Sequence, residues 1–249
     1  MINIDELNLI SSFYNNPSMN DVKKDQKKDD DLILAFVAAL LLEYTITNEK
    51  LQLAPKERVI EYKKATDLIN KTFTSQIKSE TKNVTDILKE TMSKMVERLS
   101  GKSENAWNVS NKEVKDILDK TIEGKTYSDR IYDNKNQVAK MIKKEIKDFI
   151  DGKTSANKIK DNLKKKFNTN SFNTERLVEN EISRVCRALD EQYFKDNDVQ
   201  DLVYVGILDQ KICENCFSLD GKHYKVDDPN RPQLPIHVNC RCYYTIADK

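Results

Sequence analysis

The chain has 249 residues, 33% of them charged, and its 42 Lys and Arg against 41 Asp and Glu leave a formal net charge of +1. This balance excludes a uniformly polycationic nucleic-acid-binding protein, so contact with nucleic acid would need a local patch. The chain has only 5 Gly and 5 Pro, which argues against a loop-rich sandwich, a barrel or a disordered chain and favours helices with solvated faces.

The N-terminal part combines a charged segment with one strongly apolar run. Residues 22–31 are almost all charged, so we expect 1–31 to be a flexible or partly helical arm. The apolar run 32–42 would cover about 16 Å as a helix, whereas a bilayer core needs about 20 residues. We therefore expect a buried helix beginning at Leu32, and no membrane association.

A long apolar stripe follows. Pro55 suits the first turn of a helix, and Gly101 suits the position just after the end of one. Packing in a core, or against a partner, is the simplest interpretation of such a stripe, and we assign 32–103 to an N-terminal amphipathic helical region. The stripe consists of Val59, Tyr62, Ile69, Phe73, Ile77, Val84, Ile87, Leu88, Met92, Met95 and Leu99.

The middle of the chain, residues 104–200, also has helical periodicity. It predicts helices over 111–122, 136–150, from 154 or 155 to about 167, and 174–195. The last of these carries an apolar stripe, and Cys186 beside the stripe is expected to be a buried, inert thiol. Its stripe residues are Val178, Ile182, Val185, Leu189 and Tyr193.

The pattern changes at residue 201. Segments 202–208, 222–226 and 241–246 have the β-branched and aromatic composition of strands, so 201–249 is predicted to be a small β-rich cap. The predicted fold is mainly α, with a small C-terminal α+β subdomain rich in Cys and His.

The cap contains a candidate metal site. Cys213 and Cys216 form a Cys-x2-Cys pair, and His237, Cys240 and Cys242 follow twenty residues later. Two such groups can close a tetrahedron around a structural zinc ion, which would stabilise a segment too short for a large core. Five candidates compete for four positions. We favour Cys213, Cys216, His237 and Cys240, with Cys242 as either the true fourth ligand or a buried thiol.

Other interpretations of the cysteines stay open. Disulfides are disfavoured in a reducing cytosol but could form in a finished extracellular particle, and simple packing is a third alternative. A catalytic zinc would need an open position and a general base. Asp209 and Asp220 flank the Cys pair but suit turns, and His223 suits an ordinary strand position. Phosphate-loop, nucleophile-elbow and zinc-protease motifs are absent, so no enzymatic activity is predicted.

Two segments carry a family resemblance. Residues 209–222 (DQKICENCFSLDGK) and 235–242 (PIHVNCRC) resemble the closing signature of the phage Mu F-like head-morphogenesis family. Residues 124–132 (GKTYSDRIY) are similar to an upstream element of that family, and 152–155 to its break between two helices. The resemblance covers about 104–249. It departs from the family at 179–181, where Glu-Asn-Glu replaces the usual Arg-Thr-Glu, and at Ile212, where threonine is common.

This resemblance implies a structural minor capsid protein of low copy number. The implied partners are the phage portal protein and other head proteins, with packaged phage DNA as a further partner and with no membrane or small-molecule substrate. The implied roles are head assembly and DNA packaging or ejection. The implied location is the phage head near the portal, after synthesis in the host bacterial cytoplasm.

A lysine-rich stretch is the candidate DNA contact. Residues 135–166 contain eleven lysines against four acidic residues. Such a stretch could make sequence-independent phosphate contacts, although a solvated helix face is the simpler interpretation. The candidate residues are Lys143, Lys144, Lys164, Lys165 and Lys166.

Three classes of function are therefore weighed. The first is a helical adaptor that docks on the portal through its amphipathic helices. The second is a zinc-stabilised nucleic-acid-binding module, and the third, which has least support, is a metallohydrolase or nuclease.

Overall fold

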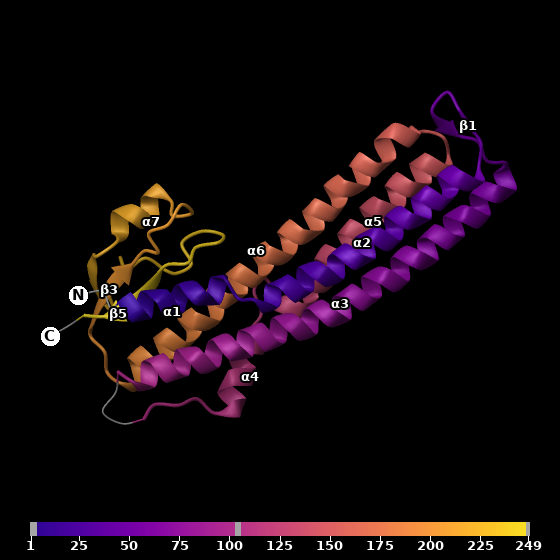
Figure 1. Cartoon of the computed structure of the whole chain (residues 1–249). Helices are drawn as coiled ribbons and strands as arrows, with labels where there is room; N and C mark the ends of the chain where they lie inside the picture. Colours follow the sequence, from indigo (N-terminus) through magenta and orange to yellow (C-terminus); the bar gives the residue numbers. More distant parts are fainter. Residues whose placement is uncertain (1–3, 103–105, 248–249) are drawn as a thin grey trace. The chain divides into compact units, whose positions relative to one another are not determined.

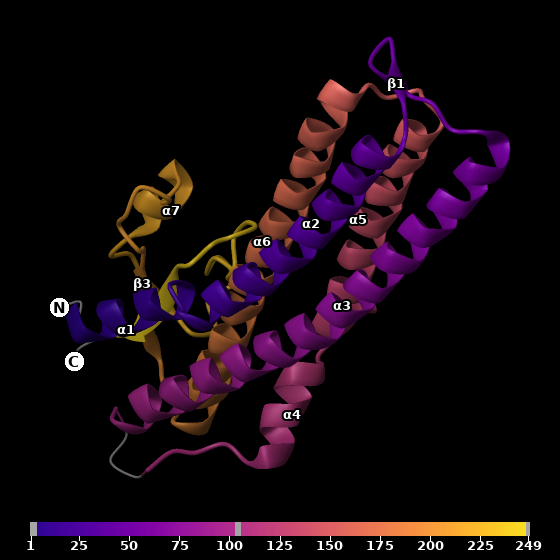
Figure 2. The same cartoon turned by 45° about the vertical axis from the view of Figure 1, so that its right-hand side comes forward.

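A computed structural model describes residues 4–102 and 106–247 (Figures 1 and 2). The described chain is mainly helical with a small C-terminal sheet, which confirms the predicted fold class. Among the described residues, no helix is both long and apolar enough to cross a bilayer.

The chain divides into two compact units, each made of separate segments. The sequential division expected from the sequence, at 31/32, 103/104 and 200/201, stays a prediction, and its middle boundary lies outside the described residues. Unit 1 comprises 1–17, 84–127 and 176–249, and unit 2 comprises 18–83 and 128–175.

Unit 2 is a bundle of four helical segments that run side by side (Figures 1 and 2). They belong to α2 (Ser18–Glu43), α3 (Pro55–Ser100), α5 (Tyr127–Ile150) and α6 (Ala156–Asp196). A hairpin of β1 (Ile46–Thr47) and β2 (Lys50–Leu51) joins α2 to α3. Asn48 and Glu49 in its turn have φ of 50° and 61°, as a two-residue turn of this kind requires.

Local sequence explains where two of these helices begin and end. α3 begins at Pro55, and the Glu57 carboxylate accepts a hydrogen bond from the Ala54 amide at 2.6 Å, which satisfies a free donor of the first turn. α5 ends at Ile150, and Gly152 then adopts a φ of 72° that favours glycine. These two predicted boundaries are confirmed.

The bundle has an apolar core along part of its length. Each of the four helices and the hairpin contributes side chains that are removed from water, the main favourable contribution to folding. Val59, one of the residues of the predicted stripe, is 70% exposed and does not belong to this core, so for Val59 only the alternative of packing against a partner stays open. The core includes Ile33, Val37, Leu40, Leu51, Ile69, Phe73, Val138, Ile142, Ile146, Phe149, Ile159 and Leu163.

A buried polar layer borders this core. The Lys135 ammonium on α5 contacts Glu80 of α3 at 2.6 Å, and Asn170 and Thr174 of α6 at 2.8 and 3.2 Å. Gln26 of α2 donates to Glu80 at 3.0 Å, so each of the four helices contributes to the layer. Burial lowers the pKa of Lys135, and the attraction of Glu80 opposes this shift.

The polar layer explains two differences from the prediction. α6 is continuous where two helices were expected, because Asn170 and Thr174 are buried in the layer instead of ending a helix. α2 begins at Ser18 and not at Leu32, because Val22 and Gln26 place one face of the charged segment in the bundle. Most of the segment expected to be a flexible or partly helical arm is therefore helical.

Unit 1 combines helices with the small sheet. It contains α1 (Ile4–Tyr14), α4 (Asn111–Asp119), α7 (Glu214–Leu219) and the remaining parts of α3 and α6. The antiparallel sheet has the order β4 (His223–Lys225), β3 (Asp201–Val205), β5 (Tyr243–Ile246). Helix α7 and the β1–β2 hairpin were not predicted, and α4 ends three residues earlier than expected.

A buried charged cluster joins the elements of unit 1. Arg98 of α3 donates to Glu6 of α1 at 2.8 Å and to Asp190 of α6 at 3.0 Å. Lys102 contacts Glu6 at 2.8 Å, and Thr245 of β5 donates to the same carboxylate at 3.1 Å. The predicted α6 stripe, from Val178 to Tyr193, is buried within unit 1 as expected.

Candidate metal centre

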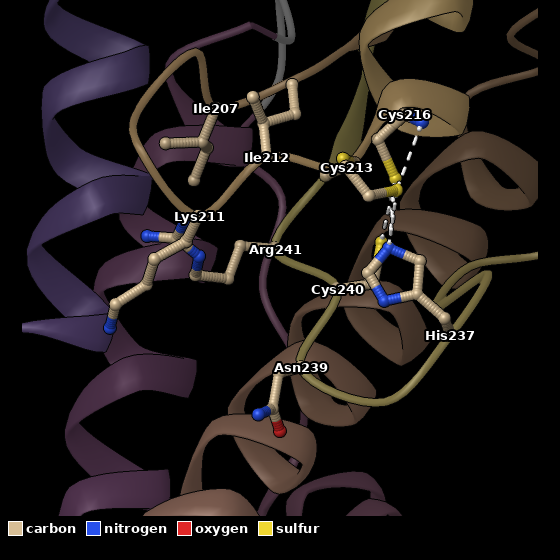
Figure 3. Close-up of a pocket in the computed structure, with 10 residues that line it drawn as sticks. Ile207, Lys211, Ile212, Cys213, Cys216, His237, Asn239, Cys240 and Arg241 are labelled. Carbon is tan, nitrogen blue, oxygen red and sulfur yellow. Dashed lines mark hydrogen bonds between the residues drawn. The ribbon is translucent and has the colours of Figure 1, made fainter.

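Three short segments of unit 1 bring the predicted ligands together (Figure 3). Cys213 precedes α7 and Cys216 lies within it, while His237 and Cys240 lie in the loop that leads to β5. Cys242 directly precedes β5. Cys216, Cys240 and Cys242 are buried, and Cys213 is partly exposed.

The Cys213–Cys216 pair is organised by the start of α7. Cys213 is the residue that caps this helix, and its Sγ accepts a hydrogen bond from the Cys216 amide at 3.4 Å. This amide lowers the pKa of Cys213, since a hydrogen-bond donor favours the thiolate. Burial instead raises the pKa of Cys216 to about 11.

His237 faces both sulfurs of this pair. Its Nε2 lies 3.2 Å from Cys213 Sγ and 3.2 Å from Cys216 Sγ (Figure 3). Its Nδ1 lies 2.8 Å from the Val238 carbonyl oxygen, which can only accept, so Nδ1 carries a proton. This hydrogen bond raises the pKa of His237. In the neutral ring Nε2 then carries the lone pair that a metal would use.

Cys240 extends the cluster on the other side of Cys216. Their sulfurs are 3.8 Å apart, and two thiolates bound to one tetrahedral zinc ion are about 3.8 Å apart. Ligand atoms of Cys213, Cys216 and His237 lie within 4.8 Å of one another, and so do those of Cys216, Cys240 and Cys242. The two groups share Cys216 but do not merge, so a metal would have to draw them closer.

Among the candidate ligands, Cys242 has its largest effect on the pKa of Cys240. A hydrogen bond from Cys242 lowers the pKa of Cys240 to about 5, and the same interaction raises the pKa of Cys242. This effect favours the thiolate form of Cys240 and the thiol form of Cys242. The remaining set, three sulfurs and one imidazole, matches the N/S chemistry of a structural zinc site.

The surrounding loop is shaped by close contacts. The Gly206 amide donates to Asp220 Oδ1 at 2.8 Å, and a Cβ at Gly206 would lie 3.0 Å from Ile212 Cδ1. Asp209 pairs with Arg241 at 2.6 Å, which lowers the pKa of Asp209. Both carboxylates that flank the Cys pair therefore make contacts that hold the loop in its conformation, in agreement with their interpretation as turn residues.

The loop that contains His237 and Cys240, called the histidine loop below, is hydrogen-bonded to α6 through a residue that the sequence did not indicate. Asn239 has a φ of 63°, and its amide donates to Asn180 Oδ1 at 2.9 Å. Asn180 is one of the residues, 179–181, at which the chain departs from the Mu F-like pattern. Its hydrogen bond to the Asn239 amide gives this residue a structural role. Arg187 of α6 also donates to the Leu234 carbonyl in the same loop.

Other predicted residues lie outside the cluster. Cys186 is buried, and burial raises its pKa, as expected for an inert thiol. His223 lies in β4 opposite Val203, as expected for a strand residue.

The candidate DNA-binding lysines differ in their surroundings. Lys143 donates to Asn70 at 2.6 Å, Lys144 pairs with Asp148 at 2.9 Å, and Lys166 lies 3.6 Å from Glu145. Lys164 and Lys165 are exposed. Lys135, which was counted in the same stretch, is buried and cannot contribute to a surface patch.

Comparison with known proteins gives one family. Residues 136–245 match the family model described as Phage Mu protein F like protein. No curated protein and no solved structure was found to match the chain. The match includes all five candidate metal ligands, but it begins after the 124–132 element, whose interpretation stays a prediction.

Proposed function

Because residues 136–245 match the model of the phage Mu protein F-like family, we propose that this chain is a phage head-morphogenesis protein, a minor capsid protein of low copy number at the portal vertex. It acts there in head assembly and in DNA packaging or ejection, and it functions as a structural component and not as an enzyme. The family match, which includes the Cys/His cluster, is the observation that carries the proposal.

An apolar surface supports a contact with another head protein. Leu42 is 89% exposed, Val59 70% and Ile60 53%, and all three flank the hairpin that joins α2 to α3 in unit 2. Large apolar side chains gathered at one end of a bundle are typical of a surface that a protein partner covers. We assign the portal contact to this end of the bundle.

Co-expression with the portal protein tests this assignment. The wild-type chain should capture the portal, and Leu42→Ser or Val59→Ser should weaken capture about 10- to 100-fold, as the loss of one buried large side chain does. Leu32→Ser is the matched control, because Leu32 is 54% exposed on the same helix but farther from the hairpin. Deleting 56–100 would be less informative, since α3 contributes to both units.

The outcomes separate two statements. If the wild-type chain does not capture the portal, the portal role is wrong. If it does, and all three variants capture equally well, the portal role stands and the assigned surface is wrong.

The Cys/His cluster is proposed to hold a structural Zn²⁺ through Cys213, Cys216, His237 and Cys240. The bound ion would link α7 to the histidine loop. Protein purified from a reducing cytosol should contain about one Zn²⁺ per chain, and Cys216→Ala should abolish it. Cys186→Ala, which alters a buried thiol outside the cluster, should retain it. A fully folded, metal-free wild-type protein would disprove the zinc site.

Contact with packaged DNA is a narrower proposal that rests on exposed Lys164 and Lys165. Replacing both with Gln should reduce the salt dependence of DNA retention by about two phosphate contacts. Lys144→Gln, in which the lost lysine was already paired with Asp148, is the control. An unchanged salt slope in the double variant would rule out this contact.

A further inference from the structure

The two candidate ligands of the histidine loop lie at the two ends of one tight turn. The Cys240 amide donates to the His237 carbonyl at 3.1 Å, which closes a four-residue turn over 237–240. Asn239, which lies between the two ligands in this loop (Figure 3), has the positive φ that some turns require at their third residue. Asparagine tolerates this conformation better than most residues. The turn therefore fixes how His237 and Cys240 are placed relative to each other.

This turn is anchored on α6 at the residue between the two ligands. The Asn239 amide donates to Asn180 Oδ1 at 2.9 Å. The Asn180 side chain also donates through Nδ2 to the Arg176 carbonyl, one helical turn earlier, at 2.7 Å. Because both polar ends of the Asn180 amide are bonded, the orientation of its oxygen is fixed by the helix. The acceptor for the turn is thus held on a rigid element.

A second contact fastens the start of the same loop to the same helix. Arg187 donates to the Leu234 carbonyl and to the Gln233 side-chain oxygen. Residues 180 and 187 are seven positions apart, so they lie on one face of α6. Val238, inside the turn, is 60% exposed, so its side chain adds little packing that could hold the turn. Polar contacts with α6 are therefore the main restraint on this part of the loop.

We propose that Asn180 is a positioning residue of the metal centre: through the Asn239 amide it holds the turn that presents His237 and Cys240 to the ion. It acts through the backbone of the loop and not on a ligand atom. Without this anchor, binding of the ion has to order the turn, and the entropy of that ordering lowers the affinity. The inference rests on the proposed zinc site and adds to it a residue of α6.

The test removes the side-chain amide of Asn180. Wild type and Asn180→Leu are purified, reduced, freed of metal and titrated with Co²⁺, whose thiolate charge-transfer absorption reports on the bound sulfurs. Leucine branches at the same carbon and has the higher helix propensity, so α6 should stay intact. The variant should raise the dissociation constant about 3- to 10-fold, which corresponds to the net contribution of one hydrogen bond. Its spectrum at saturation should equal that of the wild type, because all four ligands are retained.

Three control variants separate this anchor from a general loss of structure. Asn180→Asp keeps an acceptor for the Asn239 amide and should bind Co²⁺ nearly as tightly as the wild type. Asn239→Gly keeps the amide and suits the φ of 63°, and it loses a side-chain oxygen that has no hydrogen-bond partner among the described residues. Gln192→Leu removes an amide of α6 that donates to Glu113 of α4 at 2.6 Å and not to the loop. The last two should also leave the affinity unchanged.

The stability of the metal-free protein distinguishes a positioning role from a purely structural one. A purely structural contact would lower the melting temperature of metal-free Asn180→Leu and leave its Co²⁺ affinity unchanged, which would overturn the inference alone. The inference is also overturned if any of the three controls binds as weakly as Asn180→Leu, or if the spectrum of Asn180→Leu at saturation differs from the wild type. Wild-type protein that fails to bind Co²⁺ overturns the zinc proposal and the inference with it.

Discussion

Replacing Lys135 with Met should destabilise the four-helix unit far more than the loss of a surface lysine. The side chains of Lys135 and Glu80 are 1% and 4% exposed and 2.6 Å apart. Removing the ammonium leaves the Glu80 carboxylate in the interior without a cation, and breaking such a buried pair costs about 3–5 kcal/mol. Methionine fills a similar volume, so a cavity should add little.

A second substitution separates the charge effect from packing. Changing Glu80 to Gln as well removes the uncompensated charge, while an amide can still bond with Gln26 and Thr174, which lie 3.0 and 3.1 Å from the Glu80 carboxylate. The double variant should therefore lie within about 1–2 kcal/mol of the wild type. Lys144→Met is the surface control, because its pair with Asp148 lies at the surface, where an ion pair contributes little to stability.

Urea unfolding followed by far-ultraviolet circular dichroism measures these differences. The sole tryptophan, Trp107, belongs to unit 1 and packs edge-on against Tyr193 at 5.2 Å, so its fluorescence reports separately on that unit. The reasoning is refuted if Lys135→Met costs less than about 1 kcal/mol, or if adding Glu80→Gln restores none of the loss.

Three further outcomes are expected. Arg98→Met, which leaves two carboxylates in unit 1 without their shared cation, should cost about 3–5 kcal/mol in unfolding followed by Trp107 fluorescence; a loss below about 1 kcal/mol would contradict it. Burial raises the pKa of Asp30 to about 7, so the folded chain holds this proton more tightly than the unfolded chain. The resulting stability is fully present below about pH 4 and is lost as pH rises through about 7. Asp30→Asn should flatten the melting temperature over this window, and an equally steep profile would argue against it. Gly206→Ala places a Cβ 3.0 Å from Ile212 and should cost about 1–3 kcal/mol, with an unchanged melting temperature as the contrary result.

The sequence predicts those features of the fold that depend on local pattern. The stripe from Val178 to Tyr193 and the end of α5 before Gly152 follow from periodicity and turn chemistry, and both are observed. The polar residues around Asn170 suggested a helix break, because such side chains compete for backbone hydrogen bonds. In the structure, contacts from Lys135 and Gln76 satisfy Asn170, and the helix continues.

The candidate site also has one part that the local sequence pattern predicts and another that depends on tertiary contacts. Spacing alone identified Cys213, Cys216, His237 and Cys240, since two short pairs suffice to suggest a shared ion. Spacing could not show that Cys242 lies beside both Cys216 and Cys240, nor that the Asn239 amide donates to Asn180 of α6. Those relations depend on the tertiary fold, which places residues far apart in the sequence beside each other.

The charged cluster around Glu6 has a consequence for synthesis on the ribosome. Thr245, one of the partners of Glu6, is translated 239 residues after it. At about 5–20 residues per second, the interval is about 10 to 50 seconds. During that time the nascent α1 lacks most of the surface that covers it, so Ile10 and Phe13 stay available to chaperones or to another chain. Unit 2 needs only residues up to 175, so it can finish folding first.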